Sequence, residues 1–165
     1  MKIAHADRAQ VPALVGLMTT SPLLRRYAVT PRGARTSLLG ALRDHDIVRV
    51  ATERGQVFGF AWVVPLRALG GTAYLRLLLV AEGHRSRGIG ADLLADAERS
   101  ARTKRCRHML LLVTSSNRRG RAFYAREGYR YVGSLADFAR AGITEAMYVK
   151  SLQYAPAILR IDSGA

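Results

Sequence analysis

The sequence is poor in the residues that build cross-links and metal centres. Its 165 residues include one cysteine, Cys106, and four histidines. A single cysteine cannot form an internal disulfide, and four scattered histidines do not supply the Cys/His spacing of a zinc site. We therefore expect neither a disulfide framework nor a bound metal ion.

Long hydrophobic runs are also missing. No apolar run approaches the roughly 18 residues that a membrane-spanning helix needs, and residues 1–7 lack the apolar core of a signal peptide. Hydrophobic residues still make up 49% of the chain, with 15 glycines and five prolines, which excludes collagen-like, low-complexity and disordered classes. We expect a soluble cytoplasmic protein without membrane contacts, folded as one domain over 1–165, with 152–165 as a candidate C-terminal tail.

Acidic residues are scarce compared with basic ones. Twelve Asp and Glu stand against 26 Lys and Arg, which gives a formal net charge of +14. The densest basic stretch runs from Arg85 to Arg130. Such a field attracts polyanions, either nucleic acid or phosphorylated small molecules. Because 23 of the 26 basic residues are arginine, a coding bias with solvated surface charges is the alternative explanation.

Hydrophobic periodicity predicts the order of secondary-structure elements. Two hairpin-forming strands precede a strand–helix–strand crossover, which indicates an α+β fold with a mixed sheet. A ligand crevice is expected where the buried central strand ends and the next helix begins. The expected strands span 2–4, 46–53, 56–66, 73–80, 108–114, 129–137 and 145–152, and the expected helices span 9–19, 33–44, 88–104 and 117–127.

The turn after the strand at 73–80 carries a phosphate-binding pattern, Arg85-Ser86-Arg87-Gly88-Ile89-Gly90. Gly88 and Gly90 allow backbone N–H groups to approach a ligand, and the helix that begins there presents unpaired amides and its positive end. The alternative is that the glycines only permit a tight turn. No Gly-Lys-Ser/Thr of a P-loop is present, and a dinucleotide fingerprint needs a small residue where Leu93 stands.

A second segment follows at 117–129, with Asn117, Phe123, Tyr124, Gly128 and Tyr129. Together the two segments resemble the motifs Arg/Gln-x-x-Gly-x-Gly/Ala and Asn-x-x-Ala-x-x-Phe-Tyr-x-x-x-Gly-Phe of the GCN5-related N-acetyltransferase (GNAT) family. The resemblance covers about 46–151, with Gly120, Glu82 and Ser86 as departures from the common residues. It implies a mixed, mostly antiparallel sheet of about seven strands flanked by about four helices, with a β-bulge or splay at the central strand.

The resemblance implies acetyl-CoA as cosubstrate, no metal, and a set of cofactor-binding residues. In the family, strand amides hold the thioester carbonyl, the glycine-rich turn wraps the pyrophosphate, and a tyrosine protonates the leaving thiolate. Tyr124 matches that acid, although a core Phe-Tyr pair is the alternative reading, and Asn117 is also a helix cap. The implied cofactor residues are Leu79, Val80, Arg85, Ser86, Arg87, Gly88, Ile89, Gly90, Ala91, Asn117, Phe123 and Tyr124.

The general base is not identified by the sequence. Many relatives carry Glu on the central strand, at a position that matches Arg76, and arginine cannot accept a proton at working pH. We expect Tyr27, Arg76, Asp137 and Glu145 to contact the acceptor, although both carboxylates could be surface residues beside turns. Without a strand base, an α-amino group, whose pKa is about 7.7–8.0, is the favoured acceptor.

These features predict an enzyme that moves the acetyl group of acetyl-CoA to a primary amine of a small molecule or a peptide N-terminus, by direct attack in a ternary complex. The alternative is a non-catalytic acyl-CoA-binding or RNA-associated module that uses the basic surface. Nucleic acid is a less favoured partner than the amine. The sequence does not decide whether the chain forms a homodimer.

Overall fold

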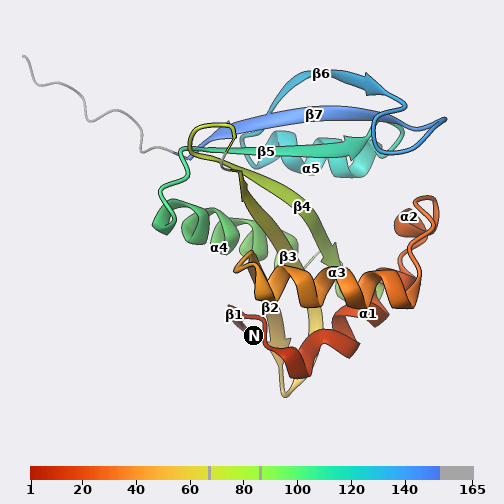
Figure 1. Ribbon diagram of the computed structural model, residues 1–165, viewed down its shortest axis with the longest axis vertical. Coiled ribbons are helices and arrows are strands. Elements are labelled where there is room, and N and C mark those ends of the chain that lie inside the picture. Colours follow the sequence, from red (N-terminus) through yellow and green to blue (C-terminus); the bar gives the residue numbers. More distant parts are fainter. Residues whose placement is uncertain (67, 86, 153–165) are drawn as a thin grey trace, which may run out of the picture.

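The structure, a computed structural model, describes residues 1–66, 68–85 and 87–152. It contains a seven-stranded sheet in the order β1-β2-β3-β4-β5-β7-β6 (Figure 1). All neighbouring strands are antiparallel except β4 and β5, which are parallel. The strands are β1 (Lys2–His5), β2 (Ile47–Glu53), β3 (Gln56–Leu66), β4 (Thr72–Val80), β5 (His108–Thr114), β6 (Arg130–Ala136) and β7 (Thr144–Ser151).

The predicted α+β fold and its order of elements are confirmed. The α-helices are α1 (Val11–Thr20), α2 (Pro22–Arg25), α3 (Pro31–Arg43), α4 (Ile89–Thr103) and α5 (Arg118–Arg126). The short helix α2 lies between the helices expected at 9–19 and 33–44, where the sequence predicted no helix. Helix α3 begins two residues earlier than expected because the Thr30 side chain caps it, accepting the Gly33 N–H at 3.1 Å.

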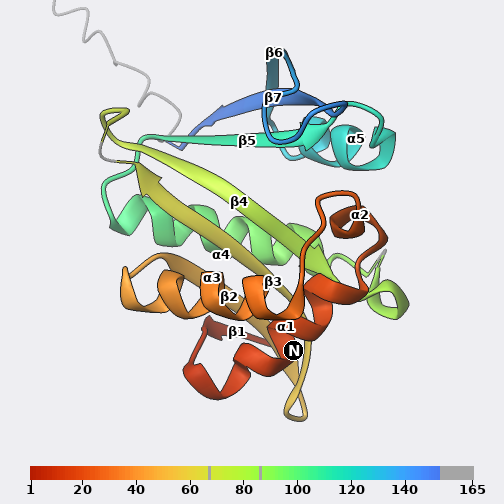
Figure 2. The ribbon, with the colours of Figure 1, turned by 45° about the vertical axis from the view of Figure 1, so that its right-hand side comes forward.

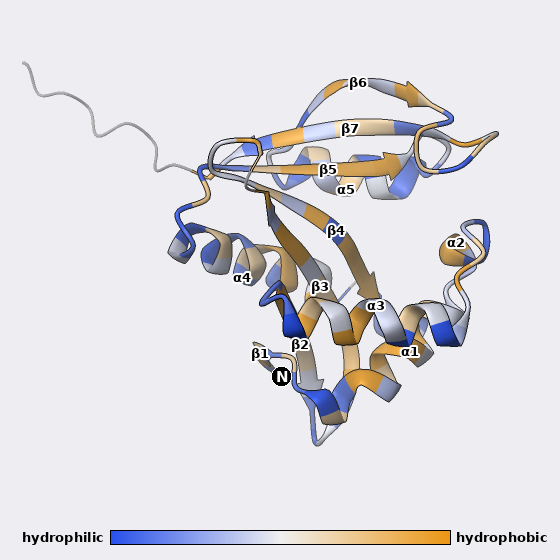
Figure 3. Cartoon of the chain, viewed as in Figure 1, coloured by the Kyte–Doolittle hydropathy of each residue, from blue (hydrophilic) through white to orange (hydrophobic). Residues whose placement is uncertain are grey.

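Helices cover both faces of the sheet, so the fold has two hydrophobic cores. Alternation along β2 sends Val48 and Val50 into the core under α1 and α3, and Ile47 and Ala51 into the core under α4. Figure 2 shows α1 and α3 on one side of the strands and α4 on the other. In Figure 3 the hydrophobic residues, drawn in orange, lie along the strands and along the helices that pack on them.

The sheet splits between β4 and β5. These strands pair only from Thr72 with His108 to Leu75 with Leu111, and beyond that point they diverge (Figures 1 and 2). A β-bulge lies at the same place, because Trp62 pairs with Leu77 and Val63 with Leu75, which leaves Arg76 as the extra residue of β4. The bulge and splay predicted for the central strand are therefore present.

A buried ionic cluster connects the α4 layer to the C-terminal strands. Glu98 of α4 is 5% exposed, and it accepts hydrogen bonds from the Tyr129 hydroxyl at 2.9 Å and from Lys150 Nζ at 2.8 and 2.9 Å. Burial, reinforced by the Glu98 carboxylate, raises the pKa of Tyr129 above its ordinary value. The cluster therefore holds the protonated phenol and the charged pair together across the core.

None of the helices in the described part of the chain combines the length and the apolar character that a bilayer crossing requires. The candidate tail lies outside the described residues, apart from Leu152, whose N–H donates to the Arg107 carbonyl at 2.7 Å.

Replacing Tyr129 by Phe should destabilise the protein, because Glu98 loses one of its two partners. We expect Tyr129→Phe to lower the free energy of unfolding at pH 7 by about 1.5–3 kcal/mol, the usual contribution of a hydrogen bond to a charged group. Urea denaturation measures it. The raised pKa contributes its full stabilisation below the ordinary tyrosine pKa of about 10. The wild type should therefore lose this stability progressively as the pH rises above that value, and the variant should not.

The matched control is Tyr131→Phe, since the Tyr131 hydroxyl bonds Ser134 at 2.8 Å on the exposed surface. A change of at most about 0.5 kcal/mol is expected there. Equal stability of Tyr129→Phe and wild type would contradict the role assigned to the cluster.

Candidate active site

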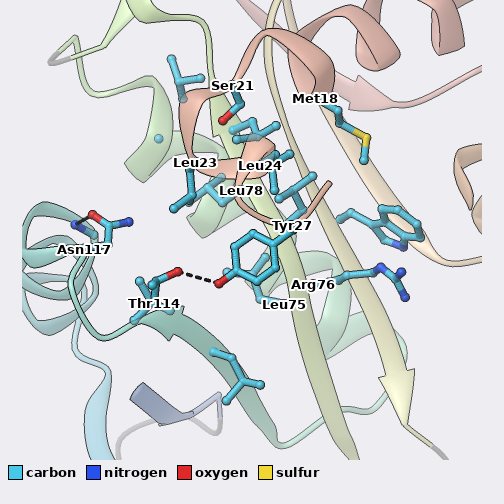
Figure 4. A pocket seen from close by; sticks show the side chains of 18 of the residues that line it. Met18, Ser21, Leu23, Leu24, Tyr27, Leu75, Arg76, Leu78, Thr114 and Asn117 are labelled. Atoms are coloured by element: carbon cyan, nitrogen blue, oxygen red, sulfur yellow. Dashed lines mark hydrogen bonds between the residues drawn. The ribbon is translucent and has the colours of Figure 1, made fainter. Parts of the chain in front are cut away.

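A cavity of about 1340 Å³ opens where β4 and β5 diverge. Its walls come from α2 and the loop after it, from β4, from the start of α4, from the end of β5, and from α5 and β7. Figure 4 shows side chains from both sides of the split sheet, including Leu78 of β4, Thr114 of β5 and Tyr27 of the loop, directed into this space. The crevice predicted at the turn between β4 and α4 therefore extends into the split between β4 and β5.

Strand β4 turns free backbone groups toward the split. The Ala81 N–H donates to the Phe58 carbonyl at 2.7 Å, and hydrogen-bonded pairs alternate along an antiparallel ladder. Leu79 therefore directs its N–H toward β3, whereas Leu78 and Val80 direct theirs into the split. Leu79, one of the expected cofactor residues, lines the cavity, but its N–H faces β3. Leu78, which the sequence did not indicate, turns its N–H into the split.

The start of α4 forms one end of the cavity. Gly88 is its N-cap and has a φ of +78°, a left-handed conformation that favours glycine. Gly88, Gly90 and Ala91 all line the cavity. The Ile89 side chain is 7% exposed and lies in the core, so this residue offers only its backbone.

Arginines surround this end of the cavity. Arg85 lines it, with Nε donating to the Val80 carbonyl at 3.2 Å and Nη1 to Glu82 at 3.3 Å. Arg119 and Arg126 line it from α5. Arg87 is exposed and is not among the lining residues, and Ser86 lies outside the described residues. Positive side chains and helix-start amides together make an anion-binding surface.

Helix α5 brings Asn117, Phe123 and Tyr124 to the same cavity. Asn117 caps the helix, since its side chain accepts the Gly120 N–H at 2.9 Å, which confirms the predicted cap. A Cβ at Gly120 would lie 2.6 Å from Asn117 Nδ2, so glycine gives the cap its room.

Tyr124 packs against neighbouring aromatic rings and also lines the cavity. Its ring meets Phe123 and Tyr129 edge-on, at centroid distances of 5.1 and 5.7 Å. Burial, with a contribution from the neighbouring Tyr74 phenol, raises the pKa of Tyr124 above its ordinary value. The phenol therefore keeps its proton throughout the physiological pH range, as a proton donor must.

A second polar cluster joins Tyr27, Thr114 and Glu145. The Tyr27 hydroxyl lies 2.6 Å from Thr114 Oγ1 and donates to the Glu145 carboxylate. Glu145 is 3% exposed and lines the cavity. Burial and the hydrogen bond to Glu145 raise the pKa of Tyr27 to about 12. Thr114 was not anticipated, because only the pairing of β5 with β7 places it opposite Glu145.

Of the residues expected around the acceptor, Asp137 lies outside the cavity lining, whereas Arg76 is part of it. Asp137 is exposed at the β6–β7 turn, where its carboxylate accepts the Gly142 N–H at 2.6 Å, and it is not among the cavity-lining residues. Arg76 does line the cavity, but its guanidinium lies 4.6 Å from the centroid of the Trp62 ring. In Figure 4 it points away from Tyr27, so its place is at the rim.

The family assignment rests on the sequence match. The model of the acetyltransferase (GNAT) family matches residues 19–129, and the chain belongs to that family. This confirms the resemblance carried by the two motifs. No curated protein matches the chain.

Solved structures share the fold over nearly the whole chain. A ribosomal-protein-alanine N-acetyltransferase from Brucella melitensis superposes with a TM-score of 0.78 at 23% identity, covering 92% of this chain and 99% of that one. A putative acetyltransferase from Salmonella typhimurium, solved with acetyl-CoA, gives 0.76 at 17% identity, with 94% and 96% covered. An aminoglycoside 6'-N-acetyltransferase complexed with coenzyme A gives 0.77 at 17% identity, with 94% and 99% covered.

Proposed function

We propose that this acetyltransferase moves the acetyl group of acetyl-CoA to a primary amine of a small molecule or a peptide N-terminus, by direct attack in a ternary complex. The observation that carries the proposal is the split between β4 and β5. There, free strand amides, a glycine-started helix and a protonated tyrosine border one cavity. Membership in the acetyltransferase family and the fold shared with a structure that contains acetyl-CoA support it.

The residues around the cavity suit the parts of acetyl-CoA. The first-turn amides of α4, with Arg85 beside them, suit the pyrophosphate, since a helix start and guanidinium groups both favour phosphate. The N–H groups of Leu78 and Val80 and the C=O group of Leu78 suit the two amides of the pantetheine arm, because they face the split and not β3. The Val80 C=O already accepts from Arg85 Nε. When bound, acetyl-CoA supplies an activated acetyl thioester.

The chain's own groups meet the remaining needs of the transfer. An N–H of the split strand polarises the carbonyl by donating to its oxygen. Tyr124, which keeps its proton at neutral pH, donates that proton to the departing thiolate, and its phenolate regains a proton through water from the amine nitrogen as the amide forms. Strand β4 carries no carboxylate, so nothing on it takes a proton from the amine.

Turnover should therefore depend on the ionisation of the acceptor. An α-amine with a pKa of about 7.7–8.0 is partly neutral at pH 7, whereas a lysine ε-amine with a pKa of about 10.4 is neutral in fewer than about one molecule in a thousand. We expect thiol release from acetyl-CoA to be faster with alaninamide or Ala-Gly-Gly than with Nα-acetyl-lysinamide, and the rate to rise with pH through the pKa of the amine. Equal rates at pH 7 would overturn this preference, and no thiol release with any amine would favour the non-catalytic alternative.

Enlarging Gly90 should weaken cofactor binding. An ideal Cβ at Gly90 lies 3.7 Å from Phe123 of α5 and 3.8 Å from Val80 of β4, which line the same cavity. The two methyl groups of valine would therefore narrow the cavity between α4 and α5. We expect Gly90→Val to weaken coenzyme A binding at least about tenfold, or about 1.4 kcal/mol, by calorimetry. Gly90→Ala is the control, because its Cβ makes only ordinary contacts. Unchanged affinity in the valine variant would show that the cofactor does not pass here.

Removing the Tyr124 hydroxyl should slow the chemical step. Tyr124→Phe keeps the ring contacts with Phe123 and Tyr129 but deletes the proton. We expect kcat to fall about 10²–10⁴-fold, the range for loss of a general acid, with coenzyme A affinity nearly unchanged. Near-normal turnover would leave Tyr124 with a packing role only.

A further inference from the structure

We propose that the Glu145 carboxylate is the subsite that receives the ammonium group of the acceptor, and that Tyr27 is the positioning residue that aims it. This inference rests on the proposed function and adds the chemical class of the group that is bound, a cationic primary amine. It starts from a buried carboxylate that faces the cavity and has no cationic partner in the described part of the chain.

Glu145 differs in its partners from Glu98, the other buried carboxylate among the described residues. Glu98 pairs with Lys150. None of the salt bridges among the described residues involves Glu145, although the chain carries 26 Lys and Arg. Its partner is the neutral Tyr27 hydroxyl. A buried carboxylate left without a cation is costly unless a cation arrives from outside.

The carboxylate has unused capacity for donors. An ionised carboxylate offers about four acceptor sites, and in the described structure only the Tyr27 hydroxyl donates to it. A primary ammonium group presents three N–H donors on a compact charge, which fits this remaining capacity. Hydrogen bonds between two charged groups are roughly twice as strong as neutral ones, so the cavity would discriminate an ammonium from a hydroxyl.

Glu145 and Tyr124 lie on opposite faces of the sheet. Tyr124 packs against the core that contains Leu111 and Val113 of β5. Because side chains alternate along a strand, Thr114 points to the other face, and Glu145, its partner in register, points there too. The split connects the two faces, so the ammonium held at Glu145, once it has given a proton to water and become the neutral amine, would approach the carbonyl from the side opposite the proton donor.

Tyr27 is held in place by contacts of its own loop with the C-terminal half. Arg26 Nη1 donates to Ser116 Oγ at 3.3 Å, and Arg140 Nη1 donates to the Arg26 carbonyl at 2.9 Å. With its loop docked, the Tyr27 hydroxyl binds one carboxylate oxygen and also contacts Thr114, which orients Glu145 toward the cavity.

The test compares amine and hydroxyl ligands in wild type, Glu145→Gln and Tyr27→Phe. The amine is the best substrate among alaninamide, Ala-Gly-Gly and Nα-acetyl-lysinamide, and the competitor is its analogue with hydroxyl in place of the amine. Glutamine keeps the shape and an oxygen that accepts from Tyr27, but removes the charge. We expect Glu145→Gln to raise KM for the amine about 10–100-fold, to change kcat less than about threefold, and to leave inhibition by the hydroxyl analogue unchanged, consistent with loss of a charge-assisted hydrogen bond.

Tyr27→Phe should raise KM in the same direction but by less, because the Glu145 carboxylate is still present and only its orientation is lost. Glu53→Gln is the matched control. Glu53 is the last residue of β2, pairs with the N-terminal amine and is not among the cavity-lining residues. Its KM should equal that of the wild type. Coenzyme A affinity, measured by calorimetry, should be the same in all four proteins.

The outcomes separate this inference from the function beneath it. No thiol release by the wild type with any amine overturns the proposed function, and the inference with it. Turnover by the wild type with an unchanged KM in Glu145→Gln overturns the ammonium subsite alone. A loss confined to kcat in that variant also overturns it, because the carboxylate would then act in the chemistry and not in binding.

Discussion

The site depends on one constraint, that a continuous sheet stops pairing halfway along two of its strands. Each strand beside the split keeps its other neighbour, since β4 pairs with β3 along its length and β5 pairs with β7 along its length. The backbone groups that face the split are therefore held in strand geometry without a strand partner. Such groups need hydrogen bonds from water or a ligand, and a ligand with amide groups is well suited to provide them.

The parts of the site that follow from local chain geometry could be predicted from the sequence. A left-handed N-cap needs glycine, so Gly88 marked the start of α4, and an Asn side chain that accepts the N–H three residues later marked the start of α5. These signals lie within a few residues of the groups that they position. The two family motifs contain both, which is why the sequence could indicate the part of the cavity between α4 and α5.

The arrangement around Glu145 depends on long-range pairing that the sequence does not display. Tyr27 meets residues 87 and 118 positions away, Thr114 and Glu145. Asp137 and Glu145 lie on either side of the same hairpin turn. The register of β7 against β5 places Glu145 opposite Thr114 in the cavity, whereas Asp137 accepts the Gly142 N–H within the turn. The choice between Leu78 and Leu79 likewise depends on which residues pair with β3. A shift of one residue in register exchanges the two faces of a strand, so none of these assignments is readable from composition or spacing.

The buried cluster at Glu98 links the stability of the fold to the position of the proposed acid. Glu98 holds the Tyr129 hydroxyl, the Tyr129 ring lies edge-on to Tyr124, and the Tyr129 N–H donates to the Tyr124 carbonyl at 2.9 Å. A single ion pair between α4 and β7 thus supports the end of α5 that carries Tyr124. Because the split removes sheet hydrogen bonds that would otherwise join the two halves, this ionic cluster and the contacts of the Tyr27 loop must supply part of the connection. The residues that keep the split sheet together are therefore also those that orient the groups on each side of it.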